Sequence, residues 1–150
     1  MIILLSVFYL VSCNNDKVGK NNGDTVNTKK TNSSSLNGGH YQGAFTNGMK
    51  KTYISFDVSD DGKELANLTF KGYWRCNGTL EQTTIGPEKN YTITNGKVDG
   101  VIIEPEGGAA PFRYELHGSI TGDNAEGSLR VSNVPAGCDT YKLTWTAEKK

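Results

Sequence analysis

The stretch 112–132, FRYELHGSITGDNAEGSLRVS, has the pattern of one antiparallel hairpin and decides the fold class. Apolar and polar residues alternate in two runs, and turn-forming residues separate the runs at 121–124. The inner face then pairs Tyr114 with Val131, Leu116 with Leu129 and Gly118 with Gly127. On the outer face Glu115 meets Arg130, an opposite-charge pair that contributes a few tenths of a kcal/mol. Both faces therefore predict the same register.

Further hairpins follow from three other turn signals. The triplet Asp60-Asp61-Gly62 would turn 52–59 back against 63–70. Asn95-Gly96 is typical of a two-residue type I′ turn, and Asn77-Gly78 would add another turn between 73–76 and 79–85. The expected opposite pairs are Ile54 with Leu68, Phe56 with Ala66, and Ile93 with Val98.

The last apolar alternation, 141–146, predicts a final strand with Tyr141, Leu143 and Trp145 on one face. Helical patterns are few, whereas turn dipeptides recur between short alternating runs. We therefore expect an all-β fold, an antiparallel β-sandwich or a small β-barrel of about eight strands with one disulfide. The β-domain is expected to occupy 39–148, long enough for one core.

The N-terminal segment carries a targeting signal. Residues 2–11 are an apolar run that suits a signal-peptide core and is too short to span a hydrocarbon layer of about 30 Å. Leu10-Val11-Ser12-Cys13 resembles the lipobox of bacterial lipoproteins, in which the cysteine is lipidated and the chain is cleaved before it. The resemblance implies a signal peptide at 1–12 and a lipid anchor on Cys13. The alternative is an ordinary secretory peptide with an incidental cysteine.

Residues 13–38 are rich in Asn, Lys, Thr, Ser and Gly, and we expect a disordered tether there. Asn14 follows the lipidated position, where the inner-membrane retention signal of the family usually has Asp. The resemblance therefore implies a lipid-anchored protein of the bacterial cell envelope, at the periplasmic or surface face of the outer membrane.

The chain has three cysteines. With Cys13 assigned to the lipid, Cys76 and Cys138 remain as a pair in an oxidising compartment, and a disulfide between them is expected. A metal or a catalytic thiol is a poorer interpretation because only His40 and His117 could assist.

Composition and motifs argue against most kinds of chemistry. The formal net charge is +0, with no basic stripe for nucleic acid. There is no Gly-x-Ser-x-Gly elbow, phosphate loop or His-Glu-x-x-His motif, and a hairpin turn accounts for the acidic residues around Gly62. We therefore predict a protein that is not an enzyme, without catalytic residues, cofactors or metal ligands.

Short motifs spread over the folded part are similar to those of an uncharacterised family of secreted bacterial β-domains. They are Gly39-x-Tyr41-x-Gly43, Ile54-Ser55-Phe56-x-Val58, Cys76, Asn95-Gly96-Lys97, Gly118-Ser119-Ile120, Ala125-x-Gly127-x-Leu129, Cys138 and Trp145-Thr146-Ala147. The resemblance implies export and a β-sandwich-like fold. It brings no activity.

Two functions fit these expectations: a binding module for an envelope protein, a peptide or a glycan, or a structural component of an envelope complex. An enzyme is the third alternative, disfavoured because side chains of the usual catalytic types are scarce. The candidate contact residues are Tyr53, Lys71, Tyr73 and Arg75, which the first hairpin and its continuation place on one outer face. Tyr and Arg are enriched at binding hot spots, although an ordinary solvated sheet face would look the same. A bulge at Gly72 would instead turn Trp74 outward.

Overall fold

The computed structural model describes Leu36 and residues 38–150. The predicted signal peptide at 1–12, the lipidation site Cys13 and the predicted tether, apart from Leu36 and Gly38, lie outside the described residues. No helix in the described part of the chain has the length and apolar character needed to cross a bilayer.

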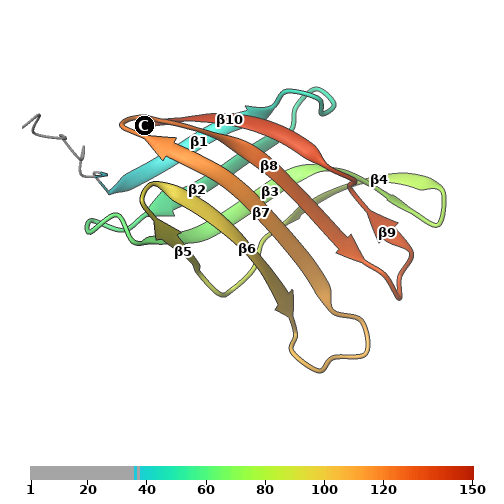
Figure 1. Cartoon of the computed structure of the whole chain (residues 1–150). Helices are drawn as coiled ribbons and strands as arrows, with labels where there is room; N and C mark the ends of the chain where they lie inside the picture. The colour runs from blue at the N-terminus through green and yellow to red at the C-terminus, as the bar shows by residue number, and fades with distance from the viewer. Residues whose placement is uncertain (1–35, 37) are drawn as a thin grey trace, which may run out of the picture. The chain divides into compact units, whose positions relative to one another are not determined.

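Ten strands, all paired antiparallel, make up the described domain (Figure 1). They are β1 (Gly39–Phe45), β2 (Tyr53–Val58), β3 (Glu64–Cys76), β4 (Thr79–Ile85), β5 (Tyr91–Thr94), β6 (Lys97–Glu104), β7 (Phe112–Thr121), β8 (Asn124–Asn133), β9 (Cys138–Asp139) and β10 (Leu143–Lys149). The all-β prediction is therefore confirmed.

Eight of the strands close into a ring. Their order is β1-β2-β3-β5-β6-β7-β8-β10, and β10 pairs with both β8 and β1. The domain is thus a closed barrel, the second of the two predicted architectures. Closure leaves β1 hydrogen-bonded on both edges, to β2 and to β10.

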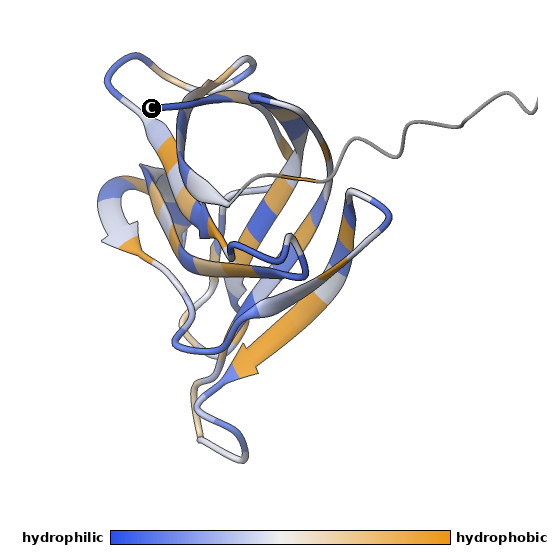
Figure 2. Cartoon of the chain, turned by 90° about the vertical axis from the view of Figure 1, so that its left-hand side faces the viewer, coloured by the Kyte–Doolittle hydropathy of each residue, from blue (hydrophilic) through white to orange (hydrophobic). Residues whose placement is uncertain are grey.

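Apolar side chains fill the barrel. Alternation along the strands places apolar residues inside and polar residues outside, visible as orange and blue bands in Figure 2. Trp145 is the largest of the fully buried side chains, and the edge of its indole lies against Gly118 and Gly127. These glycines are opposite one another on β7 and β8, so the absence of two side chains makes room for the ring.

The two ends of the barrel differ. At the turn end, tight turns join β2 to β3, β5 to β6 and β7 to β8, and Leu36 packs partly buried against the core nearby. At the loop end lie the longer β1–β2, β6–β7 and β8–β10 connections. The chain therefore enters β1 at the turn end.

One strand crosses the loop end. β3 has thirteen residues, and its last part, residues 72–76, continues beyond its pairing with β2; we call this part the cover strand. Its end pairs with β9, which in turn pairs with β8. Because β3 and β8 lie on opposite sides of the ring, this pairing bridges the opening.

The predicted disulfide is present in this bridge. Cys76 and Cys138 are opposite residues of β3 and β9, and their Sγ atoms are 2.10 Å apart. The bond therefore joins the cover strand to the segment that follows β8.

Most of the predicted registers are confirmed. β7 and β8 pair Tyr114 with Val131, Leu116 with Leu129, Gly118 with Gly127 and Glu115 with Arg130. Ile93 lies opposite Val98, and Asn77-Gly78 joins β3 to β4 in a two-residue turn. Trp74 turns toward the inside, and its ring stacks on Phe112 at 5.9 Å between centroids.

The predicted register of the first hairpin is wrong. Ile54 lies opposite Phe70, not Leu68, and Ala66 lies opposite Asp57, not Phe56. The turn holds four residues rather than three, because the Ser59 amide donates to the Glu64 carbonyl. A bulge between Ser55 and Asp57, with Asn67 at a φ of 52°, then shifts the pairing again. Each shift moves the register by one residue, so together they move it by two. Beyond the bulge the side chains therefore lie on the faces predicted for them.

The predicted start of the last strand is also wrong. β10 begins at Leu143, and Tyr141 precedes it with a φ of 54° and a side chain that is 61% exposed. The Tyr141 amide instead donates to the Asp139 carboxylate, which turns the backbone out of the strand conformation. Tyr141 therefore lies outside the core that the alternation predicted for it.

Candidate functional site

A pocket of about 150 Å³ opens at the loop end beside the cover strand. On one edge of β3, pairing with β2 ends at Lys71 and pairing with β9 begins at Arg75. The residues between them, 72–74, have no strand neighbour on that edge within the described domain. The β1–β2 loop and the start of β10 form the other walls of this gap.

The floor of the pocket is apolar. Phe45 and Leu143 line it from β1 and β10, and Trp74 lines it from the cover strand. The ring of Phe70 occupies the space where a side chain at position 72 would lie, so Gly72 brings the cover strand close to the core. The floor is thus continuous with the core.

Exposed apolar side chains gather around the pocket. The described domain has six exposed large hydrophobic residues, and three of them line this one pocket: Met49 is 51% exposed, Leu80 44% and Tyr141 61%. Single exposed apolar residues are ordinary, but a cluster beside a pocket is typical of an interaction site.

The pocket also carries a free cation. Arg75 lines it, and none of the described carboxylates lies within ion-pair distance of its guanidinium. The nearest candidate along the sheet is Asp139, which lies opposite Arg75 but is bound by Arg130. The ligand surface of this pocket is therefore apolar with a positive charge at its rim.

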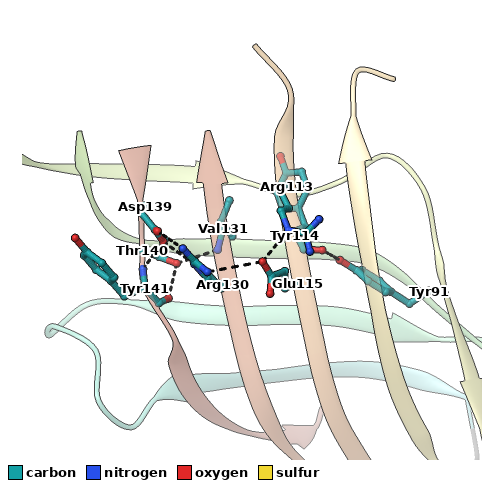
Figure 3. Close-up of polar contacts among 9 residues, drawn as sticks. All are labelled: Tyr91, Arg113, Tyr114, Glu115, Arg130, Val131, Asp139, Thr140 and Tyr141. Atoms are coloured by element: carbon teal, nitrogen blue, oxygen red, sulfur yellow. Dashed lines mark hydrogen bonds and ion pairs between the residues drawn. The ribbon is translucent and has the colours of Figure 1, made fainter. Parts of the chain in front are cut away.

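A row of ionic contacts joins side chains of β7, β8 and β9, and its last member, Asp139, also lines the pocket (Figure 3). Arg130 Nε donates to Asp139 Oδ1 at 3.1 Å, and Arg113 Nε donates to Glu115 at 2.8 Å. The hydrogen bond from Arg130 lowers the pKa of Asp139 and correspondingly raises the pKa of Arg130. The carboxylate is therefore held ionised, and the bend at Tyr141 depends on it.

Thr140 ties the same segment to β8. Its hydroxyl accepts from the Val131 amide at 2.9 Å and donates to the Tyr141 carbonyl at 2.8 Å, while its own amide donates to the Val131 carbonyl (Figure 3). These bonds hold Tyr141 in place although its ring is largely in solvent. The exposed rim is thus preorganised, which lowers the entropy cost of binding.

The predicted contact residues do share one outer face. Lys71 Nζ lies 5.8 Å from the centre of the Tyr53 ring, and the two residues are opposite one another on β3 and β2. Tyr73 and Arg75 follow on the same face and line the pocket. A binding role for the four residues remains a prediction.

Sequence reasoning missed Met49, Leu80 and Tyr141. Leu80 had a signal, because the predicted Asn77-Gly78 turn implies Arg75 opposite Leu80, as observed. Tyr141 was assigned to the core, and Met49 lies in a loop whose path no local pattern gives.

The histidines and the acidic turn form surface contacts. His40 lies 2.7 Å from Asp57, and His117 lies 2.8 Å from Asp99. Asp61 accepts from the Ser59 hydroxyl and the Lys63 amide, so it fixes the β2–β3 turn. In the described residues no three His, Cys, Asp or Glu side chains are grouped to hold a metal ion.

A larger hollow of about 550 Å³ lies on the barrel wall over β1, β7, β8 and β10. Its lining is small or polar, including Ala44, Ser119 and Thr146, and it offers no large apolar side chain to a ligand. We therefore regard the loop-end pocket as the candidate site.

Comparisons of the chain with protein-family models, with curated proteins and with solved structures found no match.

Proposed function

We propose that this protein is a binding module of the bacterial cell envelope, anchored to the outer membrane by lipid on Cys13, and that its ligand docks at the loop-end pocket. The observation that supports the site is the gathering of Met49, Leu80 and Tyr141 around one pocket beside Arg75, which pairs with none of the described carboxylates. Such a surface suits a protein or peptide segment that presents an apolar side chain next to a carboxylate.

Aliphatic rim residues favour a peptide over a glycan as the ligand. Met and aromatic residues are enriched in the cores of protein interfaces, and Arg pairs well with carboxylates there. The pocket is too small for more than a side chain, so the rest of the ligand would lie over the outer face that carries Tyr53 and Lys71.

The test is capture from envelope extract by the full chain. A triple variant, Tyr73→Ala, Arg75→Ala and Tyr141→Ala, should fold and should lose most of the captured partner, because truncating hot-spot residues costs about 2 kcal/mol or more each. The matched control removes two exposed apolar residues and a cation elsewhere: Lys97→Ala, Val101→Ala and Ile103→Ala. Equal capture by both variants would remove the pocket from consideration.

The anchor is tested separately. Cys13→Ala should convert a detergent-phase protein into an aqueous or unprocessed one, because the acyl chains supply the membrane affinity at about 0.8 kcal/mol per buried CH₂. Phase partitioning in a cloud-point detergent measures this change. Wild-type protein found wholly in the aqueous phase would refute the lipid anchor and leave the pocket proposal standing.

A structural role in an envelope complex is the second candidate function. The observation that favours it is the unpaired edge of β4, which could extend a sheet into a permanent partner. Stoichiometric recovery of one envelope protein after mild crosslinking would favour assembly, and transient recovery would favour ligand binding.

A further inference from the structure

The β3–β4 hairpin leaves one edge of β4 open. β4 pairs with β3 along its whole length, and no other described strand pairs with it (Figure 1). Asn77 and Gly78 have φ values of 48° and 86°, as in a two-residue type I′ turn. The pair flanking such a turn is hydrogen-bonded, and bonded pairs then alternate with unbonded ones. The amides and carbonyls of Leu80, Gln82 and Thr84 therefore point away from β3.

This edge lacks the usual protection. Natural edge strands are blunted by lysine, proline, a bulge or shortness. β4 has seven residues, TLEQTTI, with one charge, and its register with β3 is continuous. It is also rich in Thr and exposed for most of its length. The open edge of β4 can therefore form a hydrogen-bonded pair with another strand.

We propose that β4 pairs with β4 of a second copy of this chain, antiparallel, about a two-fold axis at Gln82. In that register Gln82 meets the partner's Gln82, and Leu80 meets the partner's Thr84. Every outward-pointing amide and carbonyl of the three residues then finds its complement in the same three residues of the partner. A two-fold interface requires such self-complementarity.

Among the symmetric registers, this one pairs all three outward-pointing residues, whereas an axis at Glu81 or at Thr83 pairs only two of them. An axis at Glu81 would place two carboxylates directly opposite one another, which is unfavourable. With the axis at Gln82, Glu81 lies opposite the partner's Thr83. The side chain of Leu80, which is 44% exposed, gains the methyl group of the partner's Thr84 as a neighbour. In this register a second copy therefore pairs all three residues without placing two charges opposite one another.

Cysteine crosslinking in whole cells tests the pairing in the full chain. Opposite residues of a bonded pair have Cα atoms about 5.5 Å apart, within disulfide range, so Gln82→Cys should give a disulfide-linked dimer on a non-reducing gel. The matched control is Thr84→Cys, because the two copies of position 84 would lie about 13 Å apart. The Thr84→Cys variant should therefore give no disulfide-linked dimer band. Equal dimer from both variants, or a crosslink from position 82 to a different protein, would overturn the proposal.

A charge swap gives a second, independent readout. Gln82→Lys and Gln82→Glu each place like charges opposite one another at the axis, so each should lose the dimer when it is produced alone. Co-production of the two variants should restore the dimer. Thr84→Lys, which meets the partner's Leu80, should keep it. A dimer that survives both single variants would refute the β4 interface, and neither result depends on the loop-end pocket.

Discussion

Gly118 and Gly127 are inside the barrel, where side chains would be expected, and Trp145 uses the space. A Cβ at position 127 would lie 2.0 Å from the His117 carbonyl and 2.7 Å from the indole edge. A Cβ at position 118 would lie 2.9 Å from both the Glu126 carbonyl and the indole. The two glycines therefore allow β7 and β8 to approach one another and admit the ring.

Gly127→Ala should destabilise the domain more than Gly118→Ala does. Both added methyl groups would meet a backbone carbonyl, but the one at position 127 would lie 2.0 Å from it and the one at position 118 2.9 Å. Relieving the closer contact requires a strand to shift, and overpacking typically costs about 1–3 kcal/mol. Urea unfolding of the two variants measures the difference. Equal free energies of unfolding would contradict the close approach of β7 and β8 at Gly127.

The Arg130–Asp139 pair predicts a dependence of stability on pH. The folded-state pKa of Asp139 lies below its unfolded value of about 3.9, so the stabilisation is complete above that pH and is lost as pH falls through the folded pKa. Because Arg130 is 45% exposed, solvent screening limits the contribution to about 1 kcal/mol. Asp139→Asn should therefore destabilise the domain at pH 7, and its difference from wild type should be smaller near pH 2.

Unfolding by urea at both pH values measures this effect. Asp60→Asn is the control, because Asp60 is exposed and has no ion-pair partner in the described part of the chain. A constant gap between Asp139→Asn and wild type at both pH values would mean that the carboxylate charge is not what stabilises the bend.

At the residue scale, alternation predicted which side chains are buried wherever the strand is regular. Leu116, Leu129, Ile54 and Phe70 are buried as expected. The alternation fails to predict burial at Asn67 and Tyr141, whose φ angles are positive. At each of these positions one residue departs from the strand conformation, so the sequence of inward and outward side chains is interrupted. The sequence around Asn67 does not indicate a bulge, because the shift in register arises from the pairing of β3 with β2.

At the element scale, the cover strand depends on the disulfide. Chain-entropy arguments give about 4 kcal/mol for a bond closing a loop of this size, here with a separation of 62 residues. Beyond its pairing with β2, the cover strand pairs with β4, which pairs with no other strand of the described domain, and with the two residues of β9. The disulfide therefore stabilises the part of β3 that has the least strand pairing to hold it in place.

Cys76→Ser with Cys138→Ser should lower the free energy of unfolding by about 4 kcal/mol. Hydrogen exchange should rise in every strand because global unfolding becomes easier, but it should rise most in the cover strand, β4 and β9 and least in β1, β7, β8 and β10. A uniform rise across the ring would show that the bond stabilises the barrel as a whole rather than the bridge over its end.

The hairpin elements could be predicted because each is a local pairing about a recognisable turn. Apart from its disulfide, the cover strand could not, because β3 and β9 meet across the barrel and their cysteines are separated by 62 positions in the sequence. The candidate pocket could be predicted only in part. Tyr73 and Arg75 were identified from local hairpin pairing, whereas Met49 and Tyr141 lie beside them only because the ring of strands closes.

At the scale of the whole molecule, the sequence left a sandwich and a barrel open because both bury one face of each strand. What distinguishes them is whether the first and last strands pair. Here Phe45 lies opposite Trp145 on β1 and β10, a contact between opposite ends of the domain sequence. Turn motifs indicate only which neighbouring strands pair, so they could not predict the contact between β1 and β10.

The two-sided pairing of β1 has a mechanical consequence. The chain reaches β1 at the turn end, while the candidate pocket lies at the loop end, so tension between an anchor and a bound partner would run along the strand. β1 is bonded to β2 on one side and to β10 on the other, and a lengthwise pull strains both ladders at once. A pull across the strand would instead open one pair at a time. With the proposed anchor at one end and the proposed ligand site at the other, the domain would resist a pull between the two.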